Sequence, residues 1–180
     1  MKNFLLIFLF FSYISIVAQD KKTATNGQIS FEASVPFYEA VEAKNNRVFS
    51  ILNTKKSEIT IVAMIKDFHF ERSLMEDHFN AHYMESRKYP KATFKGVIEK
   101  FSINKMSSSS TDYYLKGKIE IHGVTKNIRV LAKLSQTAAN EIEIQSKFSL
   151  NTEDFKIDIP YIVRSKISKN VNVELNITLK

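Results

Sequence analysis

His78 and His82 are the residues of this chain whose spacing most resembles a metal site. Their i, i+4 separation puts two imidazoles on one face of a helix, an arrangement that suits Zn²⁺. A third ligand would have to come from Glu85 or Glu71, and Phe79 stands where zinc proteases carry their catalytic glutamate. We therefore expect no resident metal, and we keep a metal-binding protein centred on these two histidines as an alternative.

Other catalytic arrangements are not supported by the sequence. The chain has no cysteine, no G-x-S-x-G nucleophile elbow and only four glycines, too few for a glycine-rich phosphate loop. Glu153 and Asp154 are adjacent, so on an extended chain their carboxylates point to opposite faces. His122 ends an alternating segment on its polar face. We expect neither enzymatic activity nor a cofactor.

The first 18 residues have the features of a secretory signal peptide. Lys2 supplies a positive charge, residues 4–17 are nearly all apolar, and Ala18 is a small residue at the expected cleavage position. The apolar stretch is shorter than the about 20 residues that span a bilayer. We expect export to the periplasm or the medium, one domain over residues 19–180 and no stable membrane anchor. With no cysteine, the domain has neither disulfides nor a cysteine for lipid attachment.

The charge pattern argues against nucleic-acid binding. The chain carries 26 basic and 19 acidic side chains, a net charge of +7. Charges of both signs are interspersed and form no basic stripe of the kind that nucleic acids require. We therefore expect no nucleic-acid partner.

Strict alternation of apolar and polar residues is the dominant pattern and predicts an all-β domain. It is clearest in the segments 28–35, 113–122, 128–134, 141–150 and 171–180, with Ser146 as a single polar exception on an apolar face. Three further segments read as strands with weaker patterns: 47–53, 58–70 and 92–101. One apolar and one wet face per strand is typical of antiparallel sheets. The sequence therefore predicts about eight antiparallel strands.

The parity of the alternation predicts the length of two hairpin connections, because paired residues share a face. Inward residues are odd-numbered up to Ile121 and even-numbered from Ile128, which requires an even-length loop around Gly123. They stay even-numbered from Leu134 to Ile142, which requires an odd-length loop or a bulge near residues 137–139.

Two segments have helical spacing. Ser73 and Glu76 match a capping box, apolar residues follow at helical intervals to Met84, and the helix should end before Pro90. Residues 160–169 are predicted as a second short helix. The serine-rich stretch 105–112 reads as a loop.

Three segments resemble motifs of the YceI-like polyisoprenoid-binding family. Residues 89–96 (YPKATFKG) are similar to its YP-x-A-x-F-x-G segment, and residues 117–126 (GKIEIHGVTK) to its G-x-L-x-I-x-G-V-T-K segment. Residues 148–157 resemble its later F…D-F-x-I segment, although Lys156 stands where the family often has glycine. The order and spacing of these three segments agree with those of the family, and the resemblance covers essentially the whole chain after residue 18.

The resemblance implies an exported eight-stranded antiparallel lipocalin-like barrel with one or two short helices. The lumen would hold an apolar lipid, a polyisoprenoid or an isoprenoid quinone, and a homodimer is compatible with it because some members dimerise. Patterning alone leaves a filled barrel, acting as a secreted interaction module, equally open. The candidate lumen residues are Phe31, Ile61, Phe94, Leu115, Ile119, Val130, Ile144, Phe148, Val173 and Leu175.

Overall fold

Eight long antiparallel strands close into a barrel in the computed structural model, which describes residues 20–180. The predicted signal peptide, residues 1–18, lies outside the described residues. The strands of the barrel are β1 (Lys21–Ser34), β2 (Glu42–Asn53), β3 (Glu58–Met64), β5 (Lys91–Ile98), β6 (Thr111–Ile121), β7 (Val124–Gln136), β8 (Ile142–Asn151) and β9 (Ile167–Leu179).

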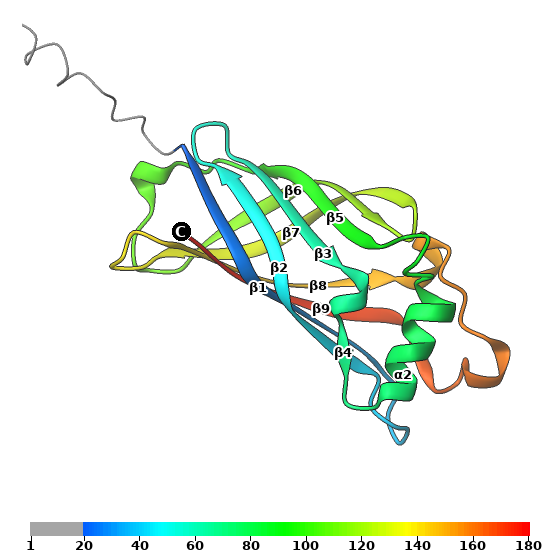
Figure 1. Cartoon of the computed structure of the whole chain (residues 1–180). Coiled ribbons are helices and arrows are strands. Elements are labelled where there is room, and N and C mark those ends of the chain that lie inside the picture. The colour runs from blue at the N-terminus through cyan, green and yellow to red at the C-terminus, as the bar shows by residue number, and fades with distance from the viewer. Residues whose placement is uncertain (1–19) are drawn as a thin grey trace, which may run out of the picture.

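The strand order shows that the sheet is closed (Figure 1). From β2 the order runs β2-β3-β5-β6-β7-β8-β9-β1, and β1 pairs again with β2. A two-residue strand, β4 (His69–Phe70), pairs with Ala43 and Lys44 of β2, on the edge of β2 that lies opposite β1. Closure leaves no long unpaired edge. The predicted eight-stranded antiparallel barrel is confirmed.

Both hairpin predictions are confirmed by the register. Ile121 pairs with Val124, so β6 and β7 are joined by a two-residue turn of His122 and Gly123. Both turn residues have positive φ, 51° and 73°, as the tight turn that matches strand twist requires. Gln136 pairs with Ile142, so the connection between β7 and β8 is the odd-length stretch 137–141.

Gly96 and Gly117 face each other across β5 and β6. A Cβ on Gly96 would lie 2.3 Å from the Lys116 carbonyl oxygen and 2.8 Å from the Phe94 ring. A Cβ on Gly117 would lie 2.3 Å from the Lys95 carbonyl oxygen. The two strands therefore approach too closely for side chains at this point, which explains why both motif segments carry glycine here.

The strand predicted over residues 58–70 is wrong in its second half. β3 ends at Met64, a 3₁₀ turn η2 (Ile65–Asp67) follows, and the chain resumes as β4. The Met64 carbonyl accepts from the Asn45 side-chain amide at 3.0 Å, and the Ile65 N–H donates to the Pro90 carbonyl at 2.9 Å. These bonds satisfy the backbone outside the strand ladder, so the chain can bend over the barrel end.

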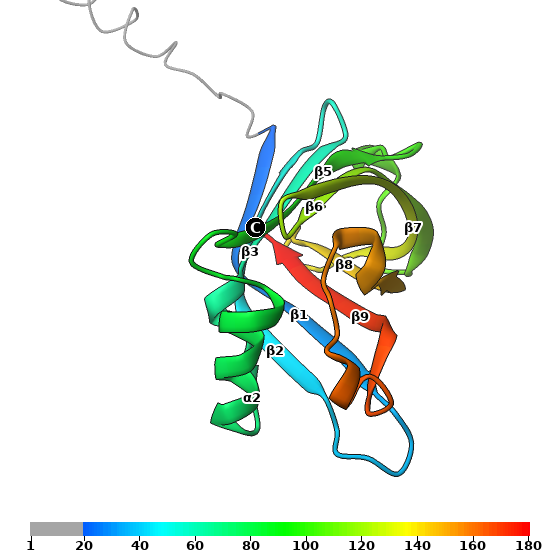
Figure 2. The ribbon, with the colours of Figure 1, turned by 90° about the vertical axis from the view of Figure 1, so that its right-hand side faces the viewer.

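The first predicted helix exists, but its cap differs. It comprises α2 (Ser73–His78) and a π-helical turn η3 (Phe79–Tyr83). Arg72 occupies the N-cap, and the Glu76 carboxylate accepts from the Phe70 N–H at 3.2 Å instead of closing a capping box. Figure 2 shows this helical segment beside one end of the barrel.

The second predicted helix, 160–169, is wrong. Only a 3₁₀ turn η6 (Tyr161–Val163) forms, and β9 begins at Ile167, which pairs with Ser34 of β1. Tyr161 and Ile162 are exposed, so two of the three side chains of this turn do not pack on the barrel. The remaining short turns are η4 (Ile103–Lys105) and η5 (Thr152–Phe155). Within residues 20–180, no helix is long and apolar enough to cross a bilayer.

Candidate binding cavity

Two neighbouring apolar cavities occupy the half of the barrel interior next to α2. The outer cavity, about 370 Å³, is partly open and reaches the residues of α2, η3 and η6. The inner cavity, about 70 Å³, is lined by residues of β1, β3, β5, β6, β7, β8 and β9. The two share six lining residues: Ile29, Ala63, Ala92, Ile119, Phe148 and Val173. The two cavities are therefore adjacent and bordered by the same side chains, and we call the pair of them the apolar path.

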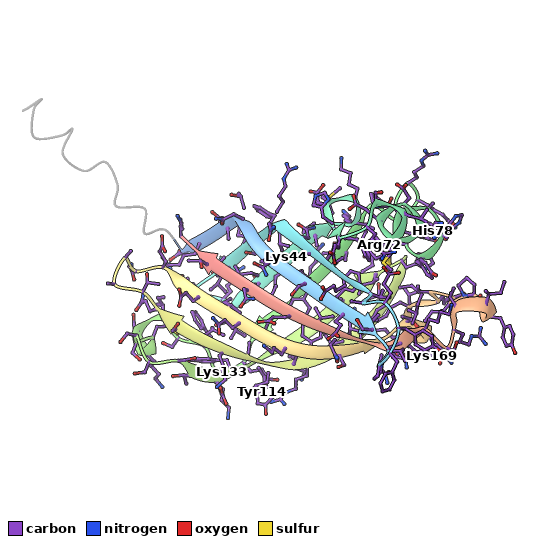
Figure 3. The ribbon with its side chains drawn as sticks, turned by 90° about the horizontal axis from the view of Figure 1, so that it is seen from below. Lys44, Arg72, His78, Tyr114, Lys133 and Lys169 are labelled. Atoms are coloured by element: carbon purple, nitrogen blue, oxygen red, sulfur yellow. The ribbon has the colours of Figure 1, made fainter. Side chains whose placement is uncertain are left out.

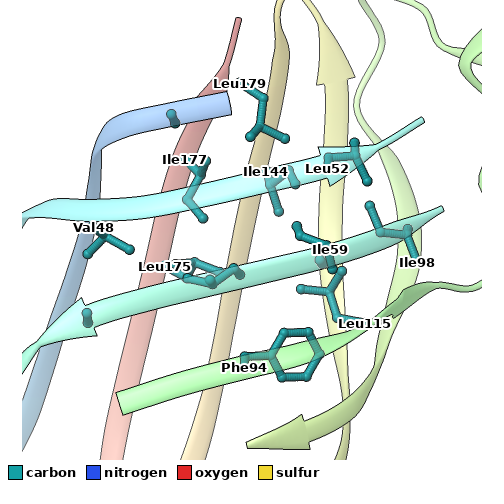
Figure 4. Packing of buried hydrophobic residues seen from close by; sticks show 14 of the residues in the cluster. Val48, Leu52, Ile59, Phe94, Ile98, Leu115, Ile144, Leu175, Ile177 and Leu179 are labelled. Atoms are coloured by element: carbon teal, nitrogen blue, oxygen red, sulfur yellow. The ribbon is translucent and has the colours of Figure 1, made fainter. Parts of the chain in front are cut away.

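The opposite half of the interior is a packed core (Figure 4). Fully buried aliphatic side chains fill it, and none of them lines either cavity: Val48, Leu52, Ile59, Ile98, Leu134, Ile142, Ile144 and Leu179. The exception in the alternation, Ser146, is also buried, and its hydroxyl donates to the Leu131 carbonyl at 2.6 Å. The interior is thus a cavity at one end and a solid core at the other.

The ten candidate lumen residues divide between these regions. The outer cavity is lined by Phe31, Ile119, Phe148 and Val173, and the last three also line the inner cavity. Ile61, Phe94, Leu115, Val130 and Leu175 line only the inner cavity. Ile144 lines neither, because it is fully buried in the packed core. Contact of any of them with a ligand stays a prediction.

An aromatic wall at the mouth is the main feature that the candidate list missed. Phe68, Phe70 and Phe79 pack with Phe31, with ring centroids 5.1–5.9 Å apart. All four rings line the outer cavity. The helical spacing that includes Phe79 was the available signal, but spacing alone does not say which surface a helix covers. The bend at η2 brings Phe68 and Phe70 to the same place.

Few polar groups reach this path. Among the described residues, no Asp, Glu, Lys or Arg lines either cavity. The polar residues at the outer cavity are His78, Tyr83, Asn151, Thr152 and Ser168, and Thr93 lines the inner cavity. Burial raises the pKa of the Tyr83 hydroxyl. The Thr152 hydroxyl is buried and has no hydrogen-bond partner among residues 20–180. The path can bury an apolar chain but offers little to polarise a reacting group.

The structure does not assemble the metal site considered above. The His78 and His82 rings lie 5.6 Å apart. Glu85, one of the two possible third ligands, instead contacts His122 Nε2 at 2.9 Å. Residues 20–180 contain no group of three His, Asp or Glu side chains placed to hold one ion.

His122 instead joins three segments near the mouth. Its Nδ1 lies 3.2 Å from the Phe155 carbonyl oxygen, its Nε2 contacts Glu85, and the Tyr89 ring lies edge-on to it at 4.5 Å. A Cβ on Gly123 would come within 2.6 Å of Tyr89. The turn between β6 and β7 is thereby held against η5, whose Phe155 lines the outer cavity, and against the end of the helical segment.

Comparisons with known proteins agree with this architecture. A polyisoprenoid binding domain from Saccharophagus degradans is 14% identical, with a TM-score of 0.79 over 89% of this chain and 98% of that chain. BcnA from Burkholderia cenocepacia is also 14% identical, with a TM-score of 0.68 over 85% of this chain and 96% of that chain. A YceI protein from Campylobacter jejuni is 17% identical, with a TM-score of 0.51 over 94% and 90%.

These likenesses show a common fold. No curated protein matches the sequence. The family model described as YceI-like domain matches residues 20–179, which is nearly all of the described barrel. The chain therefore belongs to the YceI-like family.

Proposed function

We propose that the protein is an exported carrier that binds one apolar lipid tail in the outer and inner cavities. The observation that carries this proposal is the apolar path, a pair of adjacent apolar cavities in a barrel whose other half is closely packed. The outer cavity alone falls within the size range of small-molecule sites. Burial of an apolar tail would contribute about 25 cal/mol per Å² and needs no polar partner.

An isoprenoid chain is the ligand class that we favour, either a polyisoprenoid or an isoprenoid quinone. The S. degradans relative is described as a polyisoprenoid binding domain, which supports this choice. The tail would enter past the aromatic wall and end near Leu115 and Leu175 of the inner cavity. The packed core beyond these residues limits how much of a long chain can enter, so the remainder would stay outside the barrel.

We further infer that binding, and not catalysis, is the activity of this chain. The lining of the cavities, in the described part of the chain, contains no Asp, Glu, Lys or Arg that could act together with His78 in acid–base chemistry. Export rests on the signal-like features of residues 1–18. For protein recovered outside the cytoplasm, we expect the intact mass to equal that of a chain beginning at Gln19, which is the result expected for export.

Titration of a polyprenyl quinone into wild type and Ile119→Phe tests the lipid-binding proposal. Ile119 lines both cavities, so the larger ring should block the path and weaken binding about tenfold or more while filling free volume. Leu131→Phe is the control, since Leu131 is 40% exposed on the outer wall. Wild type that takes up no quinone, or Ile119→Phe that binds as wild type does, would contradict the proposal.

A further inference from the structure

Two of the five polar residues at the outer cavity already have hydrogen-bond partners within the protein. The Asn151 side chain donates to the Asn170 side-chain oxygen at 3.1 Å and accepts from the Glu153 N–H at 2.9 Å. The Ser168 hydroxyl donates to the Asn170 carbonyl at 2.8 Å and accepts from the Asn170 N–H at 3.1 Å. Both side chains are therefore engaged in holding the wall of the cavity.

The hydroxyls of Tyr83 and Thr152, at the same cavity, have no such partners. The Thr152 hydroxyl is buried and unpaired among residues 20–180, which is a costly state for a polar group. The Tyr83 hydroxyl forms no hydrogen bond within the same residues, and burial raises its pKa, so it stays protonated and can donate. The fifth polar residue, His78, is exposed on the helical segment (Figure 3), so water can satisfy its ring. Two hydroxyls are thus left for a ligand.

The cavities offer no lysine or arginine to neutralise an anionic ligand. In the described part of the chain, neither residue type lines either cavity. Basic side chains on the segments around the outer cavity instead form ion pairs with carboxylates: Arg72 with Glu39, Arg164 with Asp158, and Lys169 with Glu153. A phosphate ester enclosed here would be a buried charge without a counter-ion, which is strongly unfavourable.

We propose that Tyr83 and Thr152 form a head-group subsite that selects isoprenoids with a neutral oxygen-bearing head, a carbonyl or a hydroxyl, against phosphate esters. Tyr83 of η3 donates a hydrogen bond to the head-group oxygen, and Thr152 of η5 supplies a second hydroxyl. A few polar groups in an otherwise apolar pocket fix the orientation of a ligand. This inference rests on the proposed function and deepens it, because it names the head group that accompanies the apolar tail.

The depth of the barrel limits the tail length of a ligand that uses this subsite. The inner cavity, about 70 Å³, is small, and the packed core lies beyond it. Only a short tail can therefore end beside Leu115 while its head lies beside Tyr83. A longer tail would carry its head out of the mouth, beyond the two hydroxyls. Ligands with two isoprene units are the appropriate probes.

Calorimetric titration with three ligands that share a geranyl tail tests the subsite: a geranyl-substituted quinone, geraniol and geranyl phosphate. Wild type should bind the first two at least about tenfold more tightly than geranyl phosphate. Tyr83→Phe and Thr152→Val, which each remove one hydroxyl at nearly constant size, should weaken quinone binding about threefold to tenfold. Tyr113→Phe is the matched control, because it removes the hydroxyl of a half-buried tyrosine of β6 that packs beside Phe101, outside both cavities. This control should bind all three ligands as wild type does.

Met75→Arg tests the charge argument by supplying a cation. Met75 is half-buried on α2 and lines the outer cavity, and an arginine pairs well with a phosphate group. This variant should bind geranyl phosphate about tenfold more tightly than wild type does, and geraniol no more tightly. A Met75→Arg variant that still rejects geranyl phosphate would contradict the charge argument.

Wild type that binds geranyl phosphate as tightly as geraniol would overturn the inference, and so would Tyr83→Phe and Thr152→Val variants that both bind the quinone as wild type does. Failure of the proposed function gives a different result, since wild type would then bind neither these ligands nor a long-chain polyprenyl quinone. Long-chain quinone binding that Ile119→Phe weakens, without discrimination between the three head groups, would remove the subsite and keep the carrier.

Discussion

At the scale of single residues, Lys156 shows how the backbone conformation of a family motif position can be kept when glycine is replaced by another residue. It follows Phe155 at the end of η5 and adopts φ 56° and ψ 34°, the left-handed conformation in which glycine has no steric cost. The YceI-like family often has glycine at this position. The backbone keeps the conformation that glycine favours, and lysine bears the steric cost.

Lys156→Gly should therefore stabilise the protein by about 0.5–1 kcal/mol. Relief of the left-handed strain exceeds the entropy that glycine gains in the unfolded chain. Chemical denaturation of both proteins measures the change, and Lys118→Gly, on the outer face of β6, is the control that should lose stability. A lower free energy of unfolding for Lys156→Gly would mean that the lysine side chain makes a stabilising contact.

At the scale of elements, the alternation of apolar and polar residues predicted the strands and the lengths of the connections between them. The turn at His122 and Gly123 and the longer connection 137–141 both follow from which face of each strand is apolar. The bend at Met64 did not show in the pattern, because it depends on a side-chain amide from β2 far along the chain. The capping box failed for a different reason, because Glu76 accepts from the Phe70 N–H, only six residues earlier in the chain. Alternation predicted local structure, and at Met64 a contact with another strand replaced it.

The glycine pair between β5 and β6 allows a test at this scale. Gly96→Ala should destabilise the barrel by about 2–3 kcal/mol, because the new methyl group meets the Lys116 carbonyl and the Phe94 ring. Gly27→Ala is the control with a smaller expected loss, since its nearest neighbours would be 3.1 Å away. Thermal unfolding of both variants gives the comparison. Equal stability of Gly96→Ala and wild type would show that the two strands separate easily.

At the scale of the whole molecule, the sequence did not distinguish a filled barrel from an open one. The structure contains both, because inward residues toward the helical end line cavities while those at the other end interdigitate. Ile119 and Ile144 illustrate the limit: both occupy inward positions of alternating strands, yet one borders free volume and the other does not. Periodicity identifies the face of a strand but not how far the opposite wall lies.

The same enlargement at these two positions should have opposite consequences. Ile144→Phe should cost about 1–3 kcal/mol, because a close-packed core has no room for the larger ring. Ile119→Phe should change the free energy of unfolding by less than about 1 kcal/mol, because its ring enters the cavities. Urea denaturation of both variants measures the difference. Equal and large losses would show that the cavities are closed in solution.

The central claim is that the apolar path holds a lipid, and native mass spectrometry of the protein purified from its own host tests it most directly. The account predicts a species heavier than the polypeptide by one apolar organic molecule, which is released on denaturation and lost in Ile119→Phe. A clean polypeptide mass from the host, with no uptake of added polyprenyl quinone, would contradict it.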